Sequence, residues 1–154
     1  MNYDTIKEEI KDIDITLPPP QEEPERQYYF IKKLQHWMEL KKEEKGRELT
    51  CCVNTFGCQM NARDSEKIIG ILMTIGYKVV EDEDADLVIF NTCTVTENAN
   101  LKVYGRLGQL KKIKNKNPEM ITMLCGCMMQ EESVVEKIKK SYRNVDIIFG
   151  THNI

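Results

Sequence analysis

Three of the six cysteines have the positions expected of a metal centre. Cys58, Cys93 and Cys127 lie 35 and 34 residues apart, and each follows a segment patterned as a strand and precedes one patterned as a helix. Because the carboxyl ends of parallel strands share one edge of a sheet, these cysteines can meet in space. A nearby helix N-terminus would favour the thiolate, which is the form that ligates metal. The spacing therefore predicts a three-thiolate site at one edge of a sheet.

Three converging thiolates favour an iron–sulfur cluster over structural zinc. Structural zinc usually has four ligands in closely spaced pairs, and this sequence has no C-x-x-C pair. A 4Fe–4S cluster held by three cysteines leaves one iron open, and an open position is typical of a catalytic metal. The spacing leaves open whether Cys125 or Cys127 is a ligand, and it leaves open two other functions. These are a flavodoxin-like module that binds a small ligand or a protein in the same crevice, and a structural zinc or thiol domain without catalysis.

The other cysteines have the positions of packing residues. Cys51, Cys52 and Cys125 lie inside apolar, strand-like segments, and a free cysteine is among the residues most often buried. The first ten residues are charged from Asp4 onward and contain no apolar signal core. We therefore expect a cytoplasmic protein, in a reducing compartment where cysteines stay unpaired.

Strand-like and helix-like segments alternate along residues 49–154, which predicts an α/β fold. Strands are expected at 49–55, 77–80, 86–91, 120–125 and 145–149, and helices at 61–75, 96–114 and 133–140. Asn61 and Thr96 have the positions of helix N-caps, and Gly76 closes the first helix. This alternation is typical of a three-layer Rossmann-like or flavodoxin-like domain with a mainly parallel sheet.

The first 48 residues differ from this pattern. They carry the whole net charge of −3, while residues 49–154 are neutral. Residues 1–25 contain four prolines and little periodicity, which predicts an extended or disordered leader. Residues 26–48 predict an amphipathic helical extension, in which an apolar stripe either packs on the domain or binds a partner.

Some classes of function are excluded by composition and motifs. A net charge of −3 excludes a nucleic-acid binder that is basic over its whole surface. The longest uncharged apolar stretch, residues 68–75, is far shorter than the ~20 residues that span a bilayer. The sequence contains neither the phosphate-binding motif G-x-x-x-x-G-K-[ST] nor G-x-G-x-x-G, and it lacks the serine-hydrolase motif G-x-S-x-G.

Two further groups of residues are candidates for binding. Lys102, Arg106, Lys111 and Lys112 belong to a positive run without an acidic residue between Glu97 and Glu119. Such a run can contact RNA phosphates, although it is also typical of a solvated helix face. Asn61 and Asn91 flank the cysteine motifs, where a side-chain amide can hydrogen-bond to cluster sulfurs; helix capping also explains Asn61.

The words around the cysteines resemble the three cluster-binding motifs of the radical S-adenosylmethionine methylthiotransferases. They read TFGCQMN at 55–61, NTCTV at 91–95 and CGCMMQ at 125–130. Further matches are ADL at 85–87, ENA at 97–99, KVYGRLG at 102–108 and FGT at 149–151. Within this family, GCQMN with ENA and VYGRLG resembles the tRNA branch, which acts on isopentenyl-adenosine beside the anticodon. The resemblance covers residues 49–154 and not residues 1–48.

This resemblance implies a three-part enzyme of which only the N-terminal, auxiliary-cluster domain is present here. Its 4Fe–4S ligands would be Cys58, Cys93 and Cys127, because the third motif places the ligand after Gly126. The cluster would serve in sulfur delivery to the adenine ring. The family's radical domain holds a second 4Fe–4S cluster in a CxxxCxxC motif and binds S-adenosylmethionine, and a small C-terminal domain grips tRNA. This sequence has no CxxxCxxC, so we expect the isolated domain not to turn over alone.

Overall fold

A five-stranded sheet carries the cysteine motifs. The structure is a computed structural model that describes residues 3–57, 59–93 and 97–150. The strands are β1 (Thr50–Phe56), β2 (Lys78–Val79), β3 (Leu87–Thr92), β4 (Ile121–Gly126) and β5 (Ile147–Phe149). Their order across the sheet is β2-β1-β3-β4-β5, and β1, β3, β4 and β5 pair in parallel. This is the strand order of flavodoxin-like folds.

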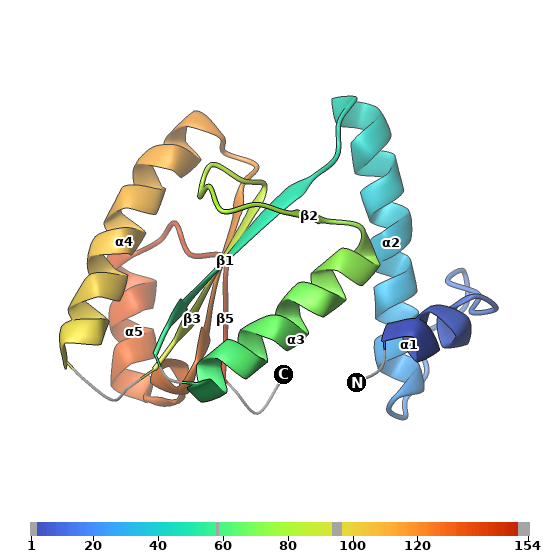
Figure 1. Ribbon diagram of the computed structural model, residues 1–154, viewed down its shortest axis with the longest axis horizontal. Helices are drawn as coiled ribbons and strands as arrows, with labels where there is room; N and C mark the ends of the chain where they lie inside the picture. The colour runs from blue at the N-terminus through green and yellow to red at the C-terminus, as the bar shows by residue number, and fades with distance from the viewer. Residues whose placement is uncertain (1–2, 58, 94–96, 151–154) are drawn as a thin grey trace. The chain divides into compact units, whose positions relative to one another are not determined.

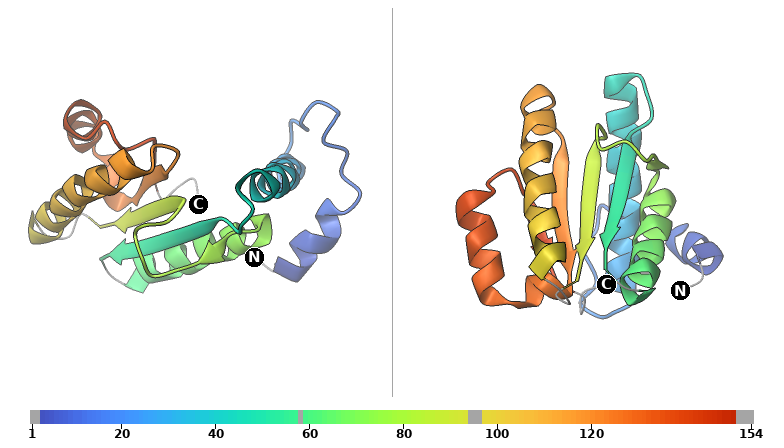
Figure 2. Two further views of the ribbon diagram at one scale, coloured as in Figure 1. Left: turned by 90° about the horizontal axis from the view of Figure 1, so that it is seen from above. Right: turned by 60° about the vertical axis from the view of Figure 1, so that its left-hand side comes forward.

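Helices cover both faces of this sheet. The helices that pack on the sheet are α3 (Gln59–Ile75), α4 (Glu97–Lys116), α5 (Glu132–Ser141) and the 3-10 turn η1 (Cys127–Gln130). In Figure 2, α4 and α5 lie over one face, and the first part of α3, residues 59–69, lies over the other. The predicted three-layer α/β domain with a mainly parallel sheet is therefore confirmed. Thr96, the expected cap of α4, lies outside the described residues.

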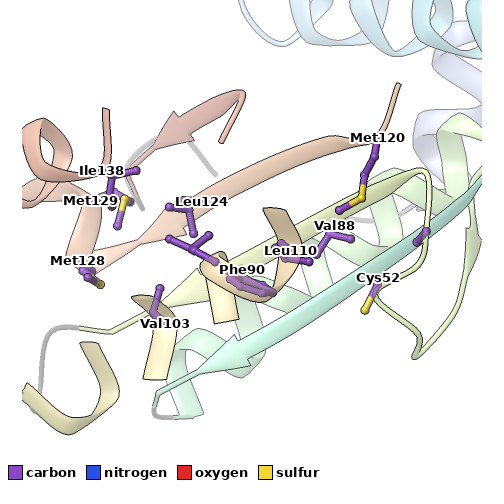
Figure 3. Close-up of a cluster of buried hydrophobic side chains, with 12 residues drawn as sticks. Cys52, Val88, Phe90, Val103, Leu110, Met120, Leu124, Met128, Met129 and Ile138 are labelled. Carbon is purple, nitrogen blue, oxygen red and sulfur yellow. The ribbon is translucent and has the colours of Figure 1, made fainter. Parts of the chain in front are cut away.

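The main core lies between the sheet and α4, α5 and η1. All six residues of β3 are buried, as expected of a strand covered on both faces. Figure 3 shows Val88 and Phe90 of β3 among side chains from the neighbouring strands and from α4, η1 and α5. Since side chains alternate along a strand, Leu87, Ile89 and Asn91 face the opposite layer, which contains α3. The two faces of β3 thus serve different purposes, an apolar core on one and a polar site on the other at its end.

The chain divides into two compact units, Met1–Leu49 with Gly70–Lys78, and Thr50–Ile69 with Val79–Ile154. The first contains α1 (Tyr3–Ile10), α2 (Glu25–Lys45) and the end of α3. Its core joins Ile6 and Ile10 of α1, Ile31 and Met38 of α2, and Ile75. The expected extended or disordered leader is therefore wrong for residues 3–10. They form a helix because Ile6 and Ile10, one turn apart, bury their side chains against this core.

The expected helical extension is present as α2. Its buried line includes Ile31 and Met38, whereas Leu34 and Trp37 remain 44% and 37% exposed. The end of α3 is attached to α2 by a hydrogen bond from Gln35 Nε2 to the carbonyl of Thr74 (2.7 Å). Within the described residues, no helix combines the length and the apolar character that crossing a bilayer requires.

Candidate metal centre

The strand register brings the three cysteine motifs to one edge of the sheet. Phe56 at the end of β1 pairs with Thr92 at the end of β3, and Thr92 pairs with Gly126 at the end of β4. Cys93 and Cys127 each come one residue after this row, so they follow neighbouring strands at the same level. In Figure 1, α3 and α4 both begin at this edge, at the bottom of the view. It is also where the strand order reverses between β1 and β3, the position at which open α/β sheets bind ligands.

The backbone before Cys58 lies directly against Cys93. A Cβ atom added to Gly57 would be 2.4 Å from Cys93 Cβ and 2.7 Å from Asn61 Oδ1. Atoms cannot approach so closely, so only glycine permits this contact between the end of β1 and the end of β3. Cys58 itself lies outside the described residues. The position of Gly57 nevertheless shows that its motif reaches the same edge as Cys93.

Gly126, which precedes Cys127, makes the second close approach. Its φ is +106°, a conformation that residues with a Cβ rarely adopt. An added Cβ would lie 2.1 Å from the carbonyl oxygen of Thr92 and 2.8 Å from Asn91 Oδ1. This turn ends β4 and starts η1 at Cys127. The end of β3 therefore lies between two positions that require glycine, Gly57 at the end of β1 and Gly126 at the end of β4.

The described cysteines at this edge have free thiols. Cys93 is buried, with 5% of its surface exposed, and Cys127 is half-buried. Within residues 3–57, 59–93 and 97–150, no three His, Cys, Asp or Glu side chains form a group that could hold a metal ion. The two thiols follow neighbouring strands, β3 and β4, and sulfur ligands of this kind are what an iron–sulfur cluster needs. The third predicted ligand, Cys58, falls outside these ranges.

The cysteines inside the strands behave differently. Cys51, Cys52 and Cys125 are at most 1% exposed. Burial raises the pKa of the Cys51 thiol to about 11 and that of Cys125 to about 12, and it also raises the pKa of Cys52. These thiols stay protonated at neutral pH, and a protonated thiol is a poor metal ligand. The prediction that these three cysteines pack inside the sheet is confirmed.

Asn61 and Asn91 meet in a buried polar cluster beside the glycines. Asn61 Nδ2 donates to the carbonyl of Thr92 (2.9 Å) and to Asn91 Oδ1 (3.2 Å). Asn91 Nδ2 donates to the carbonyl of Asn61 (2.7 Å) and to Ser65 Oγ (3.0 Å). The expected N-cap role of Asn61 is wrong, because α3 begins at Gln59 and Asn61 lies within its first turn. Its side chain points instead to the end of β3, where a buried carbonyl needs a donor.

Sequence reasoning missed three residues of this cluster. Ser65 Oγ lies 2.7 Å from Thr55 Oγ1 of β1, and Thr92 Oγ1 donates to the carbonyl of Cys125 (2.8 Å). The signal available in the sequence was the pair Asn91-Thr92, two polar residues that end the apolar run of β3. Buried polar side chains at such a position need partners, which predicts a network.

The four predicted basic residues lie on α4 but do not behave alike. Lys102, Lys111 and Lys112 are exposed. Arg106 forms an ion pair with Glu83, and its guanidinium lies over the Phe56 and Phe90 rings, 5.8 and 5.9 Å from their centroids. The charge of Arg106 is therefore engaged within the domain, whereas the other three predicted residues, Lys102, Lys111 and Lys112, are exposed to solvent.

Comparison with known proteins decides the family. The family model described as "Uncharacterized protein family UPF0004" matches residues 50–150. This chain belongs to the UPF0004 family. The UPF0004 match includes every strand of the sheet and all three cysteine motifs, and it begins at the first residue of β1.

Several curated relatives of this UPF0004 chain share one name. A tRNA-2-methylthio-N(6)-dimethylallyladenosine synthase of Lachnoclostridium phytofermentans is 68% identical over 112 residues, which cover 73% of this chain and 25% of that protein. Proteins of the same name are 52% identical in Acetivibrio thermocellus, over 86% of this chain and 28% of that protein, and 48% identical in Clostridioides difficile, over 88% and 28%. The resemblance to the methylthiotransferases is thereby confirmed. The chain spans about a quarter of the length of these relatives.

Proposed function

We propose that this chain is the auxiliary-cluster domain of a tRNA methylthiotransferase. The complete enzyme would convert isopentenyl-adenosine next to the anticodon to its 2-methylthio derivative, in the cytoplasm. The observation that carries this proposal is the row Phe56, Thr92 and Gly126, because it aligns the three cysteine motifs at the switch point of the sheet. The names of the relatives support the choice of substrate.

The proposal assigns the cluster to Cys58, Cys93 and Cys127. When bound, a 4Fe–4S cluster with three protein ligands supplies one iron open to a sulfur that is to be delivered. The protein's part is to orient the site and to limit the access of water. The buried side chain of Cys93 and the close approach of Gly57 and Gly126 keep this edge of the sheet compact.

Other parts of the reaction would lie in the rest of the enzyme. S-adenosylmethionine and the second 4Fe–4S cluster belong to a radical domain, for which this sequence has no CxxxCxxC motif. This chain would therefore hold its cluster without catalysing turnover. Its partners would be that radical domain and the tRNA.

Anaerobic reconstitution with iron and sulfide tests the cluster. We expect about four irons and four sulfides per chain, with broad visible absorbance. One tightly held zinc per chain after exposure to both metals would instead support a structural zinc domain. Tight binding of a flavin by the metal-free chain would support a flavodoxin-like module, and either result would contradict the proposal.

The lysines of α4 would contact tRNA in the complete enzyme. Replacing Lys111 and Lys112 with glutamine should weaken tRNA binding and lower its salt dependence, by roughly 0.7 to 0.9 in the log–log slope for each phosphate that is no longer neutralised. Binding is measured across a salt series. The matched control is Lys139→Gln with Lys140→Gln, two exposed lysines of α5. An equal effect of both pairs would indicate only unspecific charge attraction and would contradict a specific contact by α4.

A further inference from the structure

The amide pair Asn61 and Asn91 is placed where the cysteine-bearing segments converge. Both side chains are buried, with at most 1% of their surface exposed. They belong to elements about 30 residues apart in sequence, the first turn of α3 and the end of β3. A buried amide is costly unless it is hydrogen-bonded. Because both amides are shielded from solvent, the reason for their presence must lie in their hydrogen bonds inside the fold.

All four side-chain N–H groups of this pair are already engaged. A side-chain amide has two donors. Those of Asn61 go to Thr92 O and Asn91 Oδ1, and those of Asn91 go to Asn61 O and Ser65 Oγ. No donor of either amide is left for a sulfur atom. Direct hydrogen bonding to a cluster, the role expected from the sequence, is thus not what this arrangement provides.

The pair instead contacts the backbone beside each motif. Asn61 Oδ1 lies against Gly57, and Asn61 Nδ2 holds the carbonyl of Thr92, the residue before Cys93. Asn91 Oδ1 and the same Thr92 carbonyl lie against Gly126, the residue before Cys127. The carbonyl of Thr92 thus accepts a hydrogen bond from α3 and also lies against Gly126, where β4 ends.

We propose that Asn61 and Asn91 are positioning residues that hold Cys93 and Cys127 as a close pair of thiols before any metal is bound. They act through the backbone of Thr92 and Gly126. The relevance of this pair to a cluster rests on the proposed function, but the pairing of Thr92 with Gly126, directly before the two cysteines, does not. Such a pair of thiols would bind a thiophilic ion or group that bridges two sulfur atoms.

Phenylarsine oxide tests the thiol pair without iron. It forms two As–S bonds with two thiols and releases one water, and nothing is oxidised or reduced. The test uses the chain with Cys58→Ala, so that Cys93 and Cys127 are the paired thiols at the edge. We expect one arsenical bound per chain, and loss of this binding when Cys127→Ala is added.

The variant Asn61→Ala should weaken arsenical binding on the order of tenfold, the usual effect of removing a residue that orients a ligand. Ser65→Ala is the matched control. It also breaks the buried network, but Ser65 is not among the nearest neighbours of Gly57 or Gly126. Its affinity should stay within about twofold of the parent chain. Equal losses in both variants, or unchanged affinity in Asn61→Ala, would overturn the proposal.

A milder variant covers the case in which Asn61→Ala does not fold. Asn61→Ser keeps one donor near the Thr92 carbonyl and should give an intermediate affinity, measured on folded protein as judged by circular dichroism. An affinity of Asn61→Ser equal to that of the parent, with the Cys127→Ala loss still present, would also overturn the proposal. Failure of iron reconstitution with these arsenical results intact would contradict the proposed function and leave the positioning role standing.

Discussion

Replacing Cys127 with alanine removes the cluster from the reconstituted chain, whereas replacing Cys125 leaves it in place. We expect the iron content to fall from about four to below about one per chain for Cys127→Ala, because two cysteines cannot hold the cluster stably. Cys127 follows the Gly126 turn and is half-buried at the edge of the sheet. Each variant removes one thiol, and the two positions are only two residues apart.

Cys125 makes the matched control because it lies inside β4. It is fully buried and pairs in register with Asn91. Removing its sulfur should lower the free energy of unfolding by about 1 kcal/mol, the usual cost of a small cavity. Iron and sulfide analysis after anaerobic reconstitution gives the readout. Iron lost from Cys125→Ala but retained in Cys127→Ala would exchange the two assignments, and iron retained in both would contradict the cluster.

The substitution Gly126→Ala should cost about 3 kcal/mol or more of unfolding free energy and should also prevent iron loading. The new Cβ would lie 2.1 Å from the oxygen and 2.7 Å from the nitrogen of Thr92. Both are backbone atoms of the central strand, so they cannot move aside without breaking the β3–β4 pairing. The positive φ of +106° adds backbone strain for any residue with a Cβ.

Gly108→Ala provides the same chemical change with the opposite expected sign. Gly108 lies within α4, is exposed, and has open space around its Cβ position. Alanine is favoured over glycine inside a helix by about 1 kcal/mol, so this variant should be stabilised. Chemical denaturation followed by circular dichroism measures the free energies of unfolding of the Gly126→Ala and Gly108→Ala variants. A Gly126→Ala chain as stable as the parent would show that the end of β4 adapts, and would remove the argument for a tight turn before Cys127.

The sequence alone predicted the elements that carry the site. Apolar runs such as residues 87–90 identify buried strands, because burial on both faces excludes charged residues from such a run. Helical periodicity identified α3 and α4 for a similarly local reason. From these elements it followed that Cys93 and Cys127 come at strand ends. The four prolines within residues 1–25 led to a wrong prediction for residues 3–10, which form α1. An eight-residue helix is marginal alone, and α1 is stabilised by contacts of Ile6 and Ile10 in the core of its unit.

Only the tertiary structure decided which strand ends are neighbours and what the polar residues between them do. The order β2-β1-β3-β4-β5 places β3 between the strands that carry the other two motifs, and pairing between segments so distant along the chain leaves no local trace in the sequence. From the sequence alone, an asparagine near the start of a helix is as compatible with capping that helix as with bonding to a neighbouring strand. Asn61 became part of a buried amide pair because the carbonyl of Thr92 lies within its reach in the folded chain. Local patterns report the solvent exposure of each segment, whereas hydrogen-bond partners depend on which segments the fold brings together.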